Sequence, residues 1–241
     1  MSEKNIESIL VEDRLFPPAT GFVDKARMTE EKLAALYSRA AQDNVGYWAD
    51  MAREFLLWDR PFDTVFDDSE APNFRWFTDG ELNVSRNCID RHLEARGDKP
   101  AIIFEGEQGD TTTLTYRELH RRVCRFASTL KAYGIEKGDR VVIYMPMVPE
   151  AVIAMQACAR IGAVHSVVFG GFSANALRDR IDDAGARMLI TADGGTRGGR
   201  IIELKSAADV ALEGPDSSIE TVIVLKRSGQ EISMTEGRDV W

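Results

Sequence analysis

The stretch RVVIYMPMVPEAVIAMQACARIGAVHSVVF, residues 140–169, decides the fold. It begins and ends with short runs of mostly apolar residues, 140–145 and 164–169, and such near-continuous runs are typical of parallel strands covered on both faces. Residues 149–161 between them predict a helix. Pro149 suits its first turn, and Gly162 suits a left-handed cap just past its end. The stretch therefore predicts a β–α–β unit.

The same alternation continues to the end of the chain, with expected helices at 117–132, 174–184 and 200–212 and expected strands at 187–192 and 221–226. Two further runs, 101–104 and 114–116, flank a polar turn and predict a hairpin. Together they predict an α/β fold: a doubly wound, mostly parallel sheet with flanking helices. The strands 140–145, 164–169 and 187–192 are expected to be neighbours in the sheet. If the last two, which are consecutive in the chain, are directly adjacent, the loops that follow them lie side by side.

A different pattern fills the N-terminal part of the chain. Residues 1–28 predict a loosely structured leader, and Thr29 is expected to cap a helix. A second helix is expected from Asn44 to Trp58, with an apolar stripe packed as core: Tyr47, Trp48, Met51, Phe55 and Trp58.

Residues 59–85 lack periodicity and predict an irregular segment. Residues 87–94 predict a short helix with Cys88, Ile89 and Leu93 inward. We therefore divide the chain into an N-terminal helical and irregular segment, 1–99, and a first α/β subdomain, 100–241. The whole is expected to be an incomplete portion of a larger N-terminal domain.

Composition narrows the class of function. The 241 residues include 30 Lys and Arg against 39 Asp and Glu, a net charge of −9, which disfavours nucleic-acid binding. No apolar run approaches the ~18 residues of a membrane span, and the N-terminus lacks a signal-peptide pattern, so a cytoplasmic protein without a membrane partner is expected. Three separated cysteines, at 88, 124 and 158, predict buried free thiols.

Two glycine-rich loops follow strands at the edge where parallel sheets bind ligands. The loop at 194–200 contains Arg197 and Arg200, whose guanidinium groups suit phosphate, and it is expected to open a helix whose N-terminus favours an anion. A surface loop with solvated arginines fits the same pattern. The loop at 170–173 needs no ligand, because Ser173 can cap the following helix.

Standard catalytic patterns are missing from the chain. It contains neither a GxxxxGK[ST] nor a GxGxxG sequence. The three histidines, at 92, 120 and 165, have no nucleophile partner in sequence, and His165 is expected to pack in the core. No acid–base or nucleophilic catalysis is therefore predicted from these residues alone.

Four stretches resemble the start of the AMP-forming acetyl-CoA synthetases, in the acyl-adenylate-forming superfamily. They are WFTDGELN at 76–83, NCIDRHL at 87–93, TYREL at 115–119 and the long run at 138–173. The resemblance implies a ligase acting on acetate, ATP and CoA. The carboxylate attacks the α-phosphate of ATP to give an acyl-adenylate and pyrophosphate, and the CoA thiol then displaces AMP.

The resemblance also implies which parts of that machinery this chain holds. Mg²⁺ would stabilise the phosphate charge. The family's Ser/Thr/Gly-rich phosphate loop, adenylate motif, ribose-binding Asp and C-terminal lysine are not found up to Trp241. The chain is therefore expected to be an N-terminal fragment, to contain no catalytic or metal-binding residue, and to be inactive alone.

The resemblance implies that this chain contains part of a CoA site. The family's Arg-x-Gly-Arg turn contacts CoA and reads Arg197-Gly198-Gly199-Arg200 here. A second stretch lining the CoA nucleotide matches Phe169, Gly170 and Gly171, and a further contact matches Ile202. A propionyl-CoA or related short-chain synthetase, and a non-catalytic CoA- or nucleotide-binding module, remain alternatives.

Overall fold

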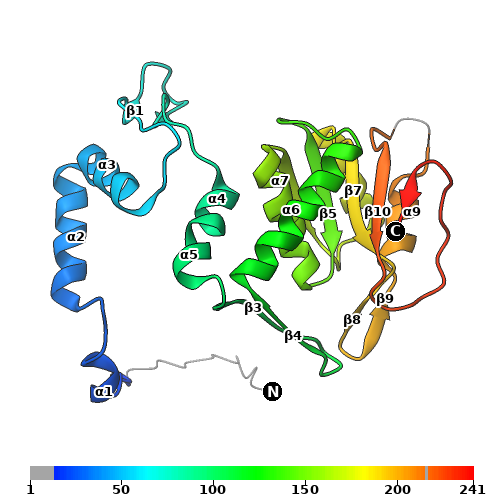
Figure 1. The fold of residues 1–241 in the computed structure, drawn as a ribbon, viewed down its shortest axis with the longest axis horizontal. Helices are drawn as coiled ribbons and strands as arrows, with labels where there is room; N and C mark the ends of the chain where they lie inside the picture. Colours follow the sequence, from blue (N-terminus) through cyan, green and yellow to red (C-terminus); the bar gives the residue numbers. More distant parts are fainter. Residues whose placement is uncertain (1–13, 215–216) are drawn as a thin grey trace, which may run out of the picture. The chain divides into compact units, whose positions relative to one another are not determined.

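The computed structural model describes residues 14–214 and 217–241, which form two compact units (Figure 1). The first unit ends at Phe55 and the second is Leu56–Trp241. None of the helices in the described ranges has the length and apolar character needed to cross a membrane. The domain boundary at residue 99 stays a prediction.

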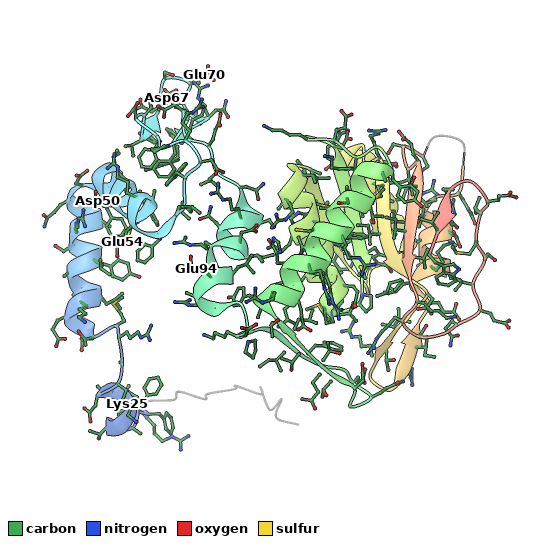
Figure 2. The ribbon with its side chains drawn as sticks, viewed as in Figure 1. Lys25, Asp50, Glu54, Asp67, Glu70 and Glu94 are labelled. Carbon is green, nitrogen blue, oxygen red and sulfur yellow. The ribbon has the colours of Figure 1, made fainter. Side chains whose placement is uncertain are left out.

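The first unit contains α1 (Thr20–Val23), α2 (Glu30–Gln42) and α3 (Asn44–Phe55). Thr29 caps α2 as predicted, because its hydroxyl accepts a hydrogen bond from the Lys32 amide at 3.3 Å. Asp50 on α3 pairs with Arg39 on α2, which ties the two helices together (Figure 2).

The predicted aromatic core of α3 is wrong in its largest members. Trp48 is 48% exposed and Phe55 is 58% exposed, whereas the buried positions of α3 are Ala49 and Ala52. Among the described residues of this unit the main contact of α3 is with α2, and one helix contact covers a narrow strip rather than a full aromatic stripe. The helix also ends at Phe55, so Trp58 lies outside it.

Residues 56–99 are mostly irregular, as predicted for 59–85. They contain β1 (Phe66–Asp67), β2 (Arg75–Trp76), α4 (Val84–Cys88), a 3₁₀ turn (Asp90–His92) and α5 (Leu93–Arg96). Asp67 and Glu70, marked in Figure 2, both pair with Arg75, at 2.8 and 3.6 Å. Trp58 packs edge-on against Phe62, with the ring centroids 4.9 Å apart.

The single helix predicted at 87–94 is broken in the structure. Asn83 starts α4 by accepting a hydrogen bond from the Arg86 amide, and the backbone leaves helical geometry at Ile89 (φ −123°, ψ −63°). The break changes which side chains point inward: Ile89 is buried, Leu93 is half-buried and Cys88 is exposed.

The main sheet has five parallel strands in the order β11-β10-β7-β5-β6. Their bounds are β5 Arg140–Met145, β6 Val164–Phe169, β7 Met188–Ala192, β10 Thr221–Leu225 and β11 Asp239–Val240. The parallel sheet and the grouping of β5, β6 and β7 are confirmed. However, β5 lies between β6 and β7, so these two strands are not directly adjacent. The chain crosses over β5 on its way from β6 to β7, because a right-handed crossover fixes handedness and not adjacency.

Helices cover both faces of this sheet (Figure 1). On one face lie α6 (Tyr116–Ala132) and α7 (Pro149–Ile161), and on the other lie α8 (Ala174–Ala184) and α9 (Leu204–Ala211). Strand β5 serves both layers, because alternate side chains point to opposite faces: Val141 and Ile143 pack in the first, Val142 and Tyr144 in the second. The doubly wound prediction is confirmed.

Two antiparallel hairpins complete the second unit. The first, β3 (Pro100–Glu105) with β4 (Thr111–Thr115), was predicted. The second, β8 (Gly195–Arg197) with β9 (Arg200–Ile202), replaces the predicted start of a helix at residue 200, and α9 begins only at Leu204. Gly198 and Gly199 have φ of +59° and +72°, the two left-handed residues that reverse a chain in a two-residue hairpin turn.

Because helices cover both faces of the sheet, shortening a side chain on a central strand is expected to destabilise the protein more than shortening one on the edge strand. Leu189 on β7 is fully buried, so Leu189→Ala is expected to lower the free energy of unfolding by ~2–5 kcal/mol. Val167 on the edge strand β6 is 52% exposed, and Val167→Ala is expected to stay within ~0.5–1 kcal/mol of the parent. Urea denaturation monitored by circular dichroism measures both. Equal losses for the two variants would contradict the layer assignment.

Candidate functional site

A pocket of about 320 Å³ lies beyond the carboxyl ends of the sheet strands. The chain leaves β5 toward α7 on one face and leaves the adjacent β6 toward α8 on the other, so the connections diverge here. Where the connections of adjacent strands lead to opposite faces, a crevice opens at the sheet edge, and open α/β sheets bind ligands there. The lining comes from the loops after four strands and from the β3–β4 hairpin: Met145–Val148, Phe169–Gly171, Gly195–Arg197, Ile202, Leu204, Arg227 and Phe104–Gln108.

The two glycine-rich loops meet in this pocket although β5 separates their strands. The Arg197 guanidinium lies over the Phe169 ring, 5.2 Å from its centroid. A Cβ atom added to Gly171 would lie 2.8 Å from the Phe169 ring and 2.9 Å from Arg197 Nη1. A side chain at residue 171 would therefore push the Phe169 ring or Arg197 aside. The loops lie side by side as predicted, although their strands are not directly adjacent.

Arg197 and Arg200 face each other across the β8–β9 hairpin, where they are partners in register. Like charges placed directly opposite each other destabilise a sheet. Both side chains are exposed, and no acidic side chain in the described ranges forms an ion pair with either. Two guanidinium groups at one hairpin, neither in an ion pair among the described residues, form a local cationic centre suited to phosphate, without the helix N-terminus that was expected.

The structure brings together most of the predicted residues. Five of them line the pocket: Phe169, Gly170, Gly171, Arg197 and Ile202. The other three, Gly198, Gly199 and Arg200, form the hairpin tip beside it and are not part of its lining. These three residues are connected to the pocket only because they are on the same hairpin as Arg197.

Sequence reasoning missed the β3–β4 hairpin as a wall of the pocket. Asp110 pairs with both guanidinium nitrogens of Arg227, at 2.8 and 3.1 Å, and Arg227 lies over the Phe104 ring at 5.5 Å. Glu107 Oε1 accepts a hydrogen bond of 2.7 Å from the Gly199 amide. The hairpin itself was predictable, but no local pattern tells which distant loop its tip contacts.

Asp193, just after β7, is a second residue that sequence reasoning missed. It is 1% exposed, and its carboxylate accepts hydrogen bonds from four backbone amides: Gly194, Arg227, Ser228 and Gly229. Burial alone would raise the pKa of this carboxyl, but the four amides outweigh it and hold the pKa below its ordinary value. Asp193 thereby fixes the loop that carries Arg227.

Other reactive side chains form no catalytic arrangement. Burial raises the pKa of the Cys158 thiol to about 12, so it stays protonated, whereas Cys88 is exposed, against the prediction of three buried thiols. His120 Nε2 lies 3.5 Å from Cys124 Sγ and 3.2 Å from Asp90, but a single nitrogen cannot relay a proton between them.

His165, expected to pack in the core, is half-buried on β6, and burial lowers the pKa of its imidazole. Among the described residues, no three His, Cys, Asp or Glu side chains gather closely enough to hold a metal ion. None of these groups is therefore assigned to catalysis.

A doubly wound parallel sheet with a crevice at its carboxyl edge places the chain in the class of open α/β folds, whose ligands bind beyond the strand ends. Two family models then cover nearly all of the chain. The AMP-binding enzyme family matches residues 89–239, and the acetyl-coenzyme A synthetase N-terminus matches residues 33–88. The chain belongs to the AMP-binding enzyme family, which confirms the resemblance read from the sequence.

Individual relatives agree with this assignment. The chain is 56% identical to an acetyl-coenzyme A synthetase of Thiobacillus denitrificans over 98% of its length, and 56% identical to one of Pasteurella multocida over 97%. It spans 36% of either relative. The solved acetoacetyl-CoA synthetase of Streptomyces lividans superposes with a TM-score of 0.77 at 28% identity, over 86% of this chain and 32% of that one.

The Asp193 carboxylate predicts a pH-dependent contribution to stability. Asp193→Asn keeps one acceptor oxygen but loses the charge and the bond from Gly229, so the free energy of unfolding at pH 7 is expected to fall by ~1.5–3 kcal/mol. Because the folded pKa is lowered, the wild-type contribution is fully present above the unfolded pKa of about 3.9 and is lost as the pH falls through the folded value.

The difference between wild type and Asp193→Asn should therefore shrink in acid, as measured by urea denaturation between pH 7 and pH 3. The exposed Asp182 provides the control, and Asp182→Asn should change little at any pH. A constant difference across the pH range would show that the charge of Asp193 contributes nothing.

Proposed function

We propose that this chain is the N-terminal part of an AMP-forming acetate–CoA ligase, which converts acetate, ATP and CoA into acetyl-CoA, AMP and pyrophosphate through acetyl-adenylate. The observation that carries the proposal is the 56% identity, over nearly the whole chain, to proteins named acetyl-coenzyme A synthetase. The expectation of a cytoplasmic enzyme is part of the same proposal.

The proposed share of this chain is to bind the nucleotide end of CoA. Arg197 and Arg200 would donate charge-assisted hydrogen bonds to its phosphates, since planar guanidinium groups match phosphate oxygens. Gly170 and Gly171 let the backbone come close to the ligand, Phe169 offers an apolar ring and Ile202 an apolar contact. The position of the two arginines as register partners supports this assignment, as does the turn at Gly198 and Gly199 between them.

Catalysis is assigned to none of these residues. The proposal keeps Mg²⁺ with ATP, at residues outside this chain, where it would stabilise phosphate charge. The contribution of this chain is to hold and orient CoA while its thiol reacts elsewhere.

The acyl group remains the open part of the proposal. The structural similarity to an acetoacetyl-CoA synthetase keeps other short-chain acids as a second candidate. Comparing acetate, propionate and acetoacetate as substrates of the complete ligase decides between them.

The CoA assignment predicts the effect of removing either arginine. In the complete ligase, Arg197→Ala and Arg200→Ala are each expected to raise the CoA concentration at half-saturation about tenfold, the loss of one charge-assisted hydrogen bond at the lower end of ~1.5–3 kcal/mol. Acetate-dependent ATP–pyrophosphate exchange without CoA should stay near wild type, because adenylation precedes CoA binding.

Arg121, exposed on α6 away from the pocket, provides a matched control for the loss of one positive charge. Arg121→Ala should leave both measurements unchanged. If an alanine at 197 or 200 abolished the exchange reaction and left CoA half-saturation intact, the hairpin would belong to the ATP site and the CoA assignment would be wrong.

A further inference from the structure

The tip of the β8–β9 hairpin already holds an anion supplied by the protein. Glu107, in the β3–β4 turn, places Oε1 2.7 Å from the Gly199 amide nitrogen, across 92 residues of sequence. Gly199 lies between the register partners Arg197 and Arg200. A carboxylate is therefore hydrogen-bonded to the turn that joins the two arginines, whose positive charge favours an anion.

Carboxylate and phosphate oxygens compete for the same kind of donor. A backbone amide has one hydrogen and makes one good hydrogen bond at a time. A phosphate bound at the hairpin tip must therefore either leave the Gly199 amide to Glu107 or take its place. In both cases the negative charge of Glu107 opposes that of the ligand.

The contacts around Glu107 allow its side chain to leave. The hairpin is anchored next to it by the Asp110–Arg227 pair and by the bond from the Gly106 amide to the Asp110 carbonyl, 2.7 Å. Glu107 is exposed, and in the part of the chain that the structure describes its carboxylate has no partner besides Gly199. The carboxylate can therefore swing out without disturbing the β3–β4 ladder.

We propose that Glu107 is an intramolecular competitor for the phosphate position at the hairpin tip, displaced when the phosphorylated end of the ligand binds. The inference rests on the proposed CoA site and adds a specificity device to it. A lone phosphate ion gains too few contacts to displace Glu107, whereas a ligand with several phosphates and a base gains enough. Glu107 thus screens the site against small anions.

The test compares Glu107→Gln with wild type in the complete ligase. Glutamine keeps an acceptor oxygen for the Gly199 amide and removes the charge, so a purely structural contact would survive. We expect CoA half-saturation to fall about threefold, the scale of one exposed charge interaction, with CoA-free ATP–pyrophosphate exchange unchanged. Inorganic phosphate, as a competitive inhibitor against CoA, should become more potent by a larger factor, because a lone phosphate cannot displace Glu107 from the wild-type tip.

Glu136 provides the matched control, because it is an exposed glutamate outside the lining of the pocket. Glu136→Gln should change neither measurement. A CoA half-saturation that is unchanged or raised in Glu107→Gln, or an equal effect in Glu136→Gln, would overturn the inference.

Arg197→Ala in the same series separates this inference from the proposed function. If Arg197→Ala raises CoA half-saturation while Glu107→Gln has no effect, only the competitor role is wrong. If Arg197→Ala also has no effect, the CoA site itself is wrong and the inference falls with it.

Discussion

The burial of β5 from both sides is the constraint on which the rest of the second unit depends. Residues Val141 to Met145 are all buried, and their side chains alternate between two helical layers. With β5 in the middle, its own connection leads to α7 on one face, whereas those of its neighbours β6 and β7 lead to α8 and α9 on the other. That divergence opens the crevice, and the loops around it carry Phe169 and Arg197. The site is thus a consequence of strand order rather than of any single motif.

Elements whose signal is local were predictable from the sequence. The run from 140 to 169 contains its own strand pattern, helix start and left-handed cap, and the structure reproduces each. Strand order was not predictable, because the choice between β6 and β5 as the neighbour of β7 depends on packing across the whole sheet. The paired glycines at 198 and 199 fit both a loop opening a helix and a hairpin turn. Only the flanking strands, three residues each, decide between them.

The residues of the candidate site also fall into two groups, those that the sequence reveals and those that it does not. Arg197, Arg200 and the glycines beside Phe169 could be found because glycine and arginine clusters after strands are visible in the sequence. Asp193 and Glu107 could not, because their partners lie up to 92 residues away and carboxylates on loops are common. Their importance comes from backbone amides, which leave no trace in the side-chain pattern. The CoA assignment of the eight predicted residues stays a proposal that the arrangement supports.

The pairing of Asp110 with Arg227 spans 117 residues, and Asp193 needs the amides of residues 227 to 229. Contacts of such long sequence separation form late in folding, since the chain must first lose the entropy of closing a large loop. During synthesis, which proceeds from the N-terminus, β5, β6 and β7 leave the ribosome before these partners exist. The β3–β4 hairpin and the arginine hairpin therefore both emerge before the Arg227 loop, and the nascent chain completes the pocket only after the loop following β10 has been made.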